Sequence, residues 1–128
     1  MERLPTDKLN VITDKIIKCA IEVHKNLGPG LLESIYEKAM CYELNTDNIS
    51  FSNQVIIPIP YKGTSLGEHR LDFLVENEII VEFKAVDRMD PVFKAQVLSY
   101  LRLTGKKLGL LINFNVPVLK DGIQRVIL

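Results

Sequence analysis

The sequence contains few cysteines and histidines, no long apolar run and no excess of charge of either sign. Its apolar runs are far shorter than the roughly 20 residues that a helix needs to span a bilayer. The residues from Met1 to Pro5 lead into a charged amphipathic segment and lack the apolar stretch of a secretory signal. We therefore expect a cytoplasmic protein without a membrane segment.

The 16 basic residues are matched by 16 acidic residues, so the formal net charge is zero. Proteins that bind duplexes gain most of their affinity from lysine and arginine side chains clustered on phosphates. A neutral chain is therefore not expected to coat DNA tightly and without specificity, although a local basic patch would suffice for nucleic acid at one site.

The two cysteines, Cys19 and Cys41, lie far apart in segments that are predicted to be helical, and neither belongs to a CxxC pair. This spacing favours reduced, buried packing residues over a redox or zinc role. The two histidines, His24 and His69, are too isolated for a His-rich metal site.

Apolar residues make up 47% of the 128 residues and charged residues 25%, as in an ordinary globular protein. The chain has no repeat, low-complexity tract or linker, so we predict one domain, 1–128. Hydrophobic periodicity predicts an α/β fold in the order α-α-β-β-β-α-β-β. The predicted helices span 7–26, 30–45 and 91–105, and the predicted strands span 51–61, 68–75, 79–86, 108–114 and 123–128, with a turn at 62–65.

Proline and glycine mark several of these boundaries. Asp90 is a predicted N-cap, Pro91 suits the first position of a helix, and Gly105 is typical of a residue that ends one. Pro58 and Pro60 cannot donate ladder hydrogen bonds, so we expect their strand at an edge of the sheet.

Two neighbouring predicted strands carry polar residues among apolar ones. Because side chains alternate along a strand, Glu82 and Lys84 face the same way out of the apolar segment 79–85. On the preceding strand, Arg70 and Asp72 share one face. The opposite face of that strand is predicted to carry His69, Leu71, Phe73 and Val75.

The loop between these strands decides whether the two polar faces meet. A three-residue loop at 76–78 places Asp72 opposite Glu82, with Cβ atoms roughly 5 Å apart. Its central Asn77 suits this loop, because asparagine tolerates the left-handed backbone conformation. A two-residue loop would instead place Asp72 opposite Phe83 and separate the two carboxylates.

Two carboxylates at that distance repel each other by about 1 kcal/mol in water, and by several times more in a partly dry cleft. Lys84 offsets part of this repulsion, and Mg²⁺, which prefers carboxylate oxygens and keeps several waters, would offset more. A metal ion lowers the pKa of an attacking water, and an ammonium group stabilises charge that develops on phosphorus. The cluster therefore suits phosphodiester hydrolysis; the competing interpretation is a cross-strand salt bridge on a solvated face.

With Asp72, then Glu82-Phe83-Lys84, then Gln96 on the next helix, the sequence resembles the PD-(D/E)XK nuclease superfamily. Residues 30–36, GLLESIY, are similar to the signature of its GxxExxY protein family, and so are 108–114 and 122–125. The resemblance covers almost the whole chain. It implies a restriction-endonuclease-like αβββαβ core, a mixed sheet flanked by helices, with an extra N-terminal helix and a C-terminal strand.

The resemblance also implies a role for each site residue. The metal ligands, for Mg²⁺ or Mn²⁺, would be Asp72, Glu82 and the backbone carbonyl of Phe83, and the catalytic groups would be Lys84, Glu33 and Gln96. Leu71 stands where the superfamily pattern has a proline before the aspartate, a proline that many members lack.

Several of these residues have a purely structural alternative. Glu33 lies near the start of a helix, where a carboxylate interacts favourably with the helix dipole. Tyr36 is more typical of a core residue than of a ligand. Gln96 shares a helical face with Tyr100 and equally suits packing of the helix on the sheet. Arg70 is either a phosphate contact or a structural counter-ion.

Three functions compete. The leading hypothesis is a Mg²⁺- or Mn²⁺-dependent nuclease that acts on DNA or RNA. The second is a catalytically inactive nucleic-acid-binding or oligomerisation module on the same fold, with the first helix as a candidate contact in a homodimer. The third, a binding protein for a small phosphorylated ligand that uses Lys84 and Arg70, ranks last, because no Gly-rich segment sits at a strand–helix junction.

Overall fold

The fold follows the order of helices and strands that the sequence predicts. A computed structural model describes residues 5–128, with side chains from residue 7 onward. Over this range the elements are α1 (Pro5–Leu27), α2 (Glu33–Thr46), β1 (Phe51–Tyr61), β2 (Thr64–Val75), β3 (Ile79–Lys84), α3 (Pro91–Thr104), β4 (Leu108–Asn113) and β5 (Ile123–Ile127), with a short 3-10 helix, η1 (Leu119–Gly122), before β5.

The five strands form one sheet in the spatial order β1-β2-β3-β4-β5. Neighbouring strands are antiparallel except β3 and β4, which are parallel and are connected through α3. Parallel neighbours need such a crossover, because a short turn joins only antiparallel strands. The prolines of β1 lie on an edge strand, as predicted, and the mixed sheet with its helices confirms the α/β fold class.

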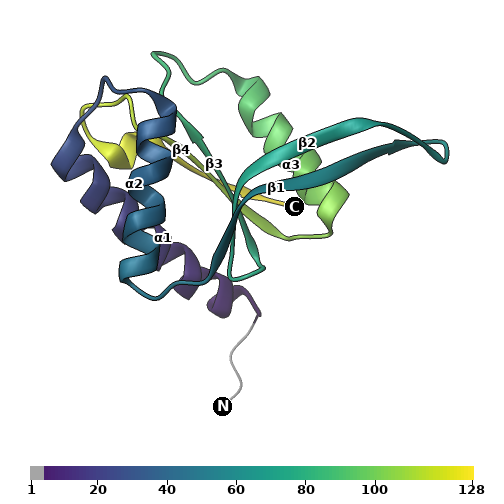
Figure 1. Cartoon of the computed structure of the whole chain (residues 1–128), viewed down its shortest axis with the longest axis horizontal. Coiled ribbons are helices and arrows are strands. Elements are labelled where there is room, and N and C mark those ends of the chain that lie inside the picture. Colours follow the sequence, from purple (N-terminus) through teal and green to yellow (C-terminus); the bar gives the residue numbers. More distant parts are fainter. Residues whose placement is uncertain (1–4) are drawn as a thin grey trace.

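Two apolar clusters lie on opposite sides of the sheet, with α1 and α2 on one side and α3 on the other (Figure 1). Side chains of β3 alternate between them. The side chains that join the α1–α2 cluster are Ile79, Val81 and Phe83, whereas Ile80 joins the α3 cluster. By the same alternation Glu82 and Lys84 point to the α3 side, so any site that they form lies between the sheet and α3.

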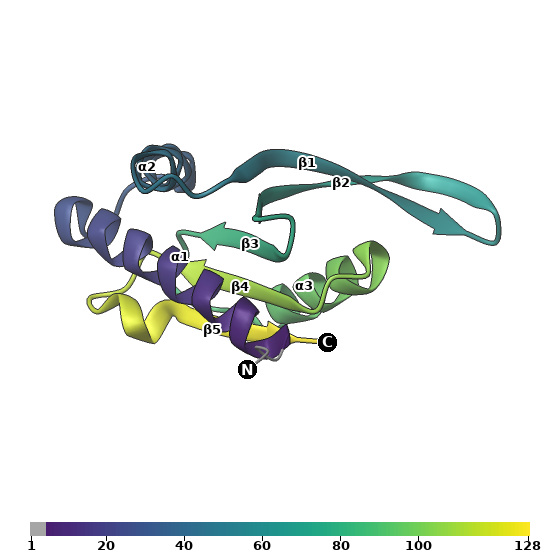
Figure 2. The same ribbon diagram turned by 90° about the horizontal axis from the view of Figure 1, so that it is seen from below.

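The β1–β2 hairpin is longer than predicted and extends beyond the rest of the sheet (Figure 2). The predicted turn at 62–65 is in fact only two residues, Lys62 and Gly63, with φ angles of 48° and 80°. Positive φ at both central residues suits a tight hairpin turn that keeps the flanking strands twisted together. Tyr61 therefore pairs with Thr64, and β2 begins four residues before its predicted start at Glu68.

Two other boundaries differ from the prediction because side chains take over backbone hydrogen bonds. The predicted helix at 30–45 begins only at Glu33, since the hydroxyl of Tyr36 donates to Gly28 O and accepts from Leu31 N and so holds a turn before α2. Likewise β3 ends before Val86. The side-chain amide of Asn113 bonds to both the N–H and the C=O of Val86 (3.1 and 2.9 Å) and removes it from the strand.

Both cysteines are free thiols. Cys19 is buried in α1 and donates from Sγ to a carboxylate oxygen of Asp47 at 3.4 Å. Burial, followed by this hydrogen bond, raises the pKa of the Cys19 thiol to about 12, so the thiol stays protonated. The predicted packing role therefore holds for Cys19, whereas Cys41 is only partly buried.

The close packing of α3 on β4 depends on Gly109. A Cβ at this position would lie 2.7 Å from Val97 Cγ1 and 3.3 Å from Ile80 O. We expect Gly109→Ala to lower the free energy of unfolding by about 1–3 kcal/mol, as overpacked cores do, in urea denaturation. Adding Val97→Ala makes room for the new methyl group, so the double variant should lose less than the sum of the two single changes. Simple additivity would show that α3 does not sit this close to the sheet.

Candidate active site

The β2–β3 loop has the three residues that place the two polar faces together. Val75 pairs with Ile79 across the loop at 76–78, and the regular ladder continues to Phe73 and Val81. Glu76 and Asn77 both have positive φ angles, 53° and 56°, which asparagine tolerates. The register prediction is confirmed.

Beyond the Phe73–Val81 pair, carboxylates replace the ladder hydrogen bonds. Oδ2 of Asp72 accepts from the N–H of Phe83 at 2.8 Å, and Oε2 of Glu82 accepts from the N–H of Asp72 at 3.1 Å. A buried amide must find an acceptor, and here each acidic side chain supplies one to the opposite strand. The same two hydrogen bonds fix Asp72 and Glu82 beside each other.

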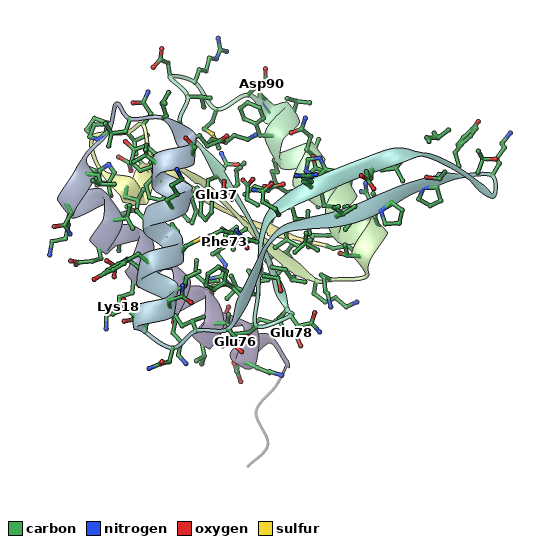
Figure 3. All side chains as sticks on the ribbon, in the orientation of Figure 1. Lys18, Glu37, Phe73, Glu76, Glu78 and Asp90 are labelled. Carbon is green, nitrogen blue, oxygen red and sulfur yellow. The ribbon has the colours of Figure 1, made fainter. Side chains whose placement is uncertain are left out.

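The predicted site residues line one pocket of about 320 Å³ between the sheet and α3. Its wall is built from β2, β3, β4, α3 and the first residue of α2. The predicted side chains that it brings together are Glu33, Arg70, Asp72, Glu82, Lys84 and Gln96. Glu76 and Glu78, in contrast, lie in the loop that joins β2 to β3, away from the pocket (Figure 3).

The prediction that His69 and Leu71 share a face with Phe73 is wrong. Phe73 packs against α1 and α2, but Leu71 belongs to the α3 cluster and His69 lines the pocket. The side-chain alternation of β2 therefore changes at Asp72.

The physical reason for this change lies on β1, where Gln54 stands opposite Asp72. Gln54 has φ 52° and is missing from the regular ladder, although the register is the same on both sides of it. Its side-chain amide donates to Glu37 at 2.6 Å, on the side of α2 that faces the strands (Figure 3). A glutamine held in this left-handed conformation rotates the β1–β2 hairpin at Gln54, so side chains before and after this point face different sides of the sheet.

The site contains two residues that the sequence analysis did not assign to it, His69, which the rotation brings to this side, and Tyr100 of α3. Nε2 of His69 lies 3.2 Å from Oε1 of Glu82, and the imidazole stacks on the Tyr100 ring at 4.0 Å between centroids. The Tyr100 hydroxyl lies 3.3 Å from Nδ1 of His69. The helical face shared by Gln96 and Tyr100 was a signal for Tyr100, but the sequence carried none for His69.

Glu82 is the most buried charged group in the pocket, with only 6% of its surface exposed. Burial, then the hydrogen bond and charge of Asp72, raise the pKa of Glu82 to about 9. Burial and the charge of Asp72 also raise the pKa of Glu33. Lys84 opposes both shifts, and its ammonium group lies 4.5 Å from the centre of the Phe93 ring, where the π-face favours a cation.

The donor set fits a hard divalent cation. Within residues 5–128 no three carboxylate, imidazole or thiolate groups form a ready-made metal cluster. Asp72 and Glu82 nevertheless offer two adjacent carboxylates in a polar pocket, and Mg²⁺ is commonly bound by one or two carboxylates with several retained waters. The carbonyl of Phe83 faces the same strand as its N–H, toward Asp72. A cation here would favour the ionised form of Glu82 and so oppose the burial and the Asp72 interactions that raise its pKa.

Comparison with known proteins agrees with this geometry. A sequence profile described as the PD-(D/E)XK nuclease superfamily matches residues 10–126, nearly the whole chain. The chain belongs to the PD-(D/E)XK nuclease superfamily. The match begins inside α1, so most of the first helix lies within the region that this superfamily profile describes.

The crystal structure of SSO0001 supports the same fold. It superposes on this superfamily member with a TM-score of 0.50 and 21% sequence identity, over 72% of this chain and 46% of that chain. The chain therefore corresponds to less than half the length of that protein. At this identity the likeness shows the restriction-endonuclease-like fold alone. No curated protein matches the sequence significantly. Among residues 5–128, no helix is long and apolar enough to cross a membrane.

The raised pKa of Glu82 predicts how the stability of the metal-free protein depends on pH. The folded state keeps the Glu82 proton up to about pH 9, whereas the unfolded chain loses it near its ordinary value of 4.5. The contribution of Glu82 to stability is therefore greatest below about pH 4.5 and is lost as pH rises toward 9. We expect the melting temperature of wild type in a chelator to fall by about 4 °C or more relative to Glu82→Gln between pH 5 and 9. Parallel curves for the two proteins would contradict the burial of an acid at this position.

Proposed function

We propose that this superfamily member is a Mg²⁺- or Mn²⁺-dependent nuclease that hydrolyses phosphodiester bonds in DNA or RNA. The observation that carries the proposal is the convergence of Asp72, Glu82 and Lys84 in one polar pocket where the regular β2–β3 ladder ends. An isolated cross-strand salt bridge would not need two carboxylates, one of them buried, beside the amine.

In this proposal Asp72, Glu82 and the carbonyl of Phe83 bind the metal ion. The bound ion supplies charge neutralisation at the phosphate and lowers the pKa of a water molecule. Lys84 orients the attacking water or stabilises the negative charge on the phosphate oxygens. Its position on the same strand face as Glu82, two residues away, supports this role.

Three further side chains of the pocket complete the proposed site. Glu33 is the first residue of α2, where the helix dipole also favours a carboxylate. The effect of the Asp72 charge on its pKa supports a place in the same electrostatic unit. Gln96 lies on the exposed pocket wall of α3, where an amide can orient water. Arg70 lies on β2 beside Asp72, at the pocket rim, and is proposed as a phosphate contact.

We also infer that the chain is a member of the GxxExxY group of the superfamily, because the three motif residues have linked structural roles. Gly30, with φ 99°, adopts a conformation that glycine allows most easily. Tyr36 is fully buried, stacks on Phe114 at 4.6 Å and holds the preceding turn through its hydroxyl. Together these residues set where α2 begins, and Glu33 is its first residue.

The proposal predicts nuclease activity that depends on the metal and on Lys84. With Mg²⁺ or Mn²⁺ at millimolar concentration, wild type should cleave labelled single-stranded or duplex DNA or RNA. Lys84→Ala and Asp72→Asn should each lower the cleavage rate by about 100-fold or more, because the first removes the positive charge beside the phosphate and the second removes a proposed carboxylate ligand of the metal. Gel-resolved cleavage time courses measure both rates.

The matched control is Glu78→Gln, which removes a carboxylate from the same hairpin but far from the pocket. Among the side chains described from residue 7 onward, that of Glu78 makes only an ion pair with Lys8, at 3.8 Å and open to solvent, and such pairs contribute little to stability. Glu78→Gln should therefore cleave like wild type. Binding of nucleic acid without cleavage, unchanged by either pocket variant, would instead support an inactive binding module.

A further inference from the structure

Glu82 is held at both of its carboxylate oxygens by β2. Its Oε2 accepts from the backbone N–H of Asp72 at 3.1 Å, and its Oε1 lies 3.2 Å from Nε2 of His69. The imidazole in turn stacks on Tyr100, whose hydroxyl lies 3.3 Å from Nδ1. The chain of contacts thus runs from α3 through β2 to the buried carboxylate of β3.

We propose that His69 is a positioning residue that orients Glu82 for metal binding, and that Tyr100 fixes the tautomer of His69 for this task. The inference rests on the proposed metal-dependent function, and it adds two residues that neither the sequence analysis nor the superfamily resemblance assigned to the site. His69 acts through Glu82 and does not itself bind the metal.

The proton arrangement follows from simple hydrogen-bond chemistry. A metal-binding Glu82 is ionised and can only accept hydrogen bonds, so Nε2 of His69 must carry the proton that it donates. In the neutral imidazole Nδ1 is then an acceptor, and the hydroxyl of Tyr100 donates to it. A hydrogen bond from a neighbouring ring or amide to a metal-binding side chain commonly sets that side chain's orientation and the affinity of the site.

The backbone conformation of the β1–β2 hairpin brings His69 to the same side of the sheet as Glu82. Regular alternation would put His69 on the opposite side of β2 from Asp72, and only the rotation of the hairpin at Gln54 brings it to the α3 side. The ring then fills the space between Glu82 and Tyr100, with a third of its side-chain surface exposed. Stacking against Tyr100 restricts the ring to one orientation, so its N–H direction is set before any metal binds.

Two substitutions of His69 distinguish the contribution of its hydrogen bond to Glu82 from that of its stacking on Tyr100. His69→Gln keeps a side-chain N–H donor that can reach Glu82 but loses the stack, whereas His69→Phe keeps an aromatic ring on Tyr100 but loses the donor. Tyr100→Phe keeps the stack and removes only the hydroxyl. Tyr42→Phe is the matched control, because Tyr42 is an exposed tyrosine of α2 that does not line the pocket.

The measurement is calorimetric titration of each folded variant with Mn²⁺, after urea denaturation has shown that its free energy of unfolding is close to that of wild type. We expect His69→Phe to weaken Mn²⁺ binding by about 10-fold or more, and His69→Gln to stay within about threefold of wild type. The Mn²⁺ affinity of Tyr100→Phe should lie between those of the two His69 variants, and that of Tyr42→Phe should equal that of wild type.

Two results would overturn the inference, and they are distinguishable. If wild type binds Mn²⁺ and His69→Phe binds it equally well, the positioning role is wrong while the proposed metal site stands. If wild type itself binds no Mn²⁺, the proposed metal-dependent function fails and the positioning role fails with it. Rescue by His69→Gln is the outcome that packing alone would not produce, because glutamine restores the donor and not the ring.

Discussion

The site depends on one exchange of hydrogen bonds between β2 and β3. Where the regular ladder ends at Phe73 and Val81, the N–H groups of Asp72 and Phe83 still need acceptors, and the side chains of Glu82 and Asp72 supply them. The interactions that hold the two strands together are therefore the same ones that place two acidic side chains side by side. The structural role of these residues and their proposed role in metal binding therefore cannot be separated.

This arrangement disfavours the ionised form of Glu82 in the folded protein. Glu82 is buried next to a second carboxylate, which raises its pKa, and Lys84 offsets only part of the unfavourable interaction. The surrounding elements hold the two carboxylates in place despite this unfavourable interaction. The α3 helix packs tightly on Gly109, and Asn113 anchors the chain where it leaves β3. Such local destabilisation is common where a protein is organised to bind a charged ligand.

Most of the architecture was predictable because it depends on local patterns. Hydrophobic periodicity gave the order of elements, and the three-residue loop at 76–78 gave the register that brings Asp72 to Glu82. His69 was assigned to the wrong face, because its position depends on one glutamine, Gln54, in a left-handed conformation held by a side chain of another element. The alternation of side chains along a strand does not predict such a rotation. The sequence around Gln54 contains no glycine and no asparagine–glycine pair that would indicate an irregular backbone there.

The central claim is that the end of the regular β2–β3 ladder creates a divalent-cation site between Asp72 and Glu82. The most direct test is anomalous diffraction from crystals grown with Mn²⁺, which locates the ion without reference to activity. The account predicts one strong anomalous peak within coordination distance, about 2.0–2.3 Å, of a carboxylate oxygen of each residue. A pocket without such a peak, at Mn²⁺ concentrations that support cleavage, would contradict it.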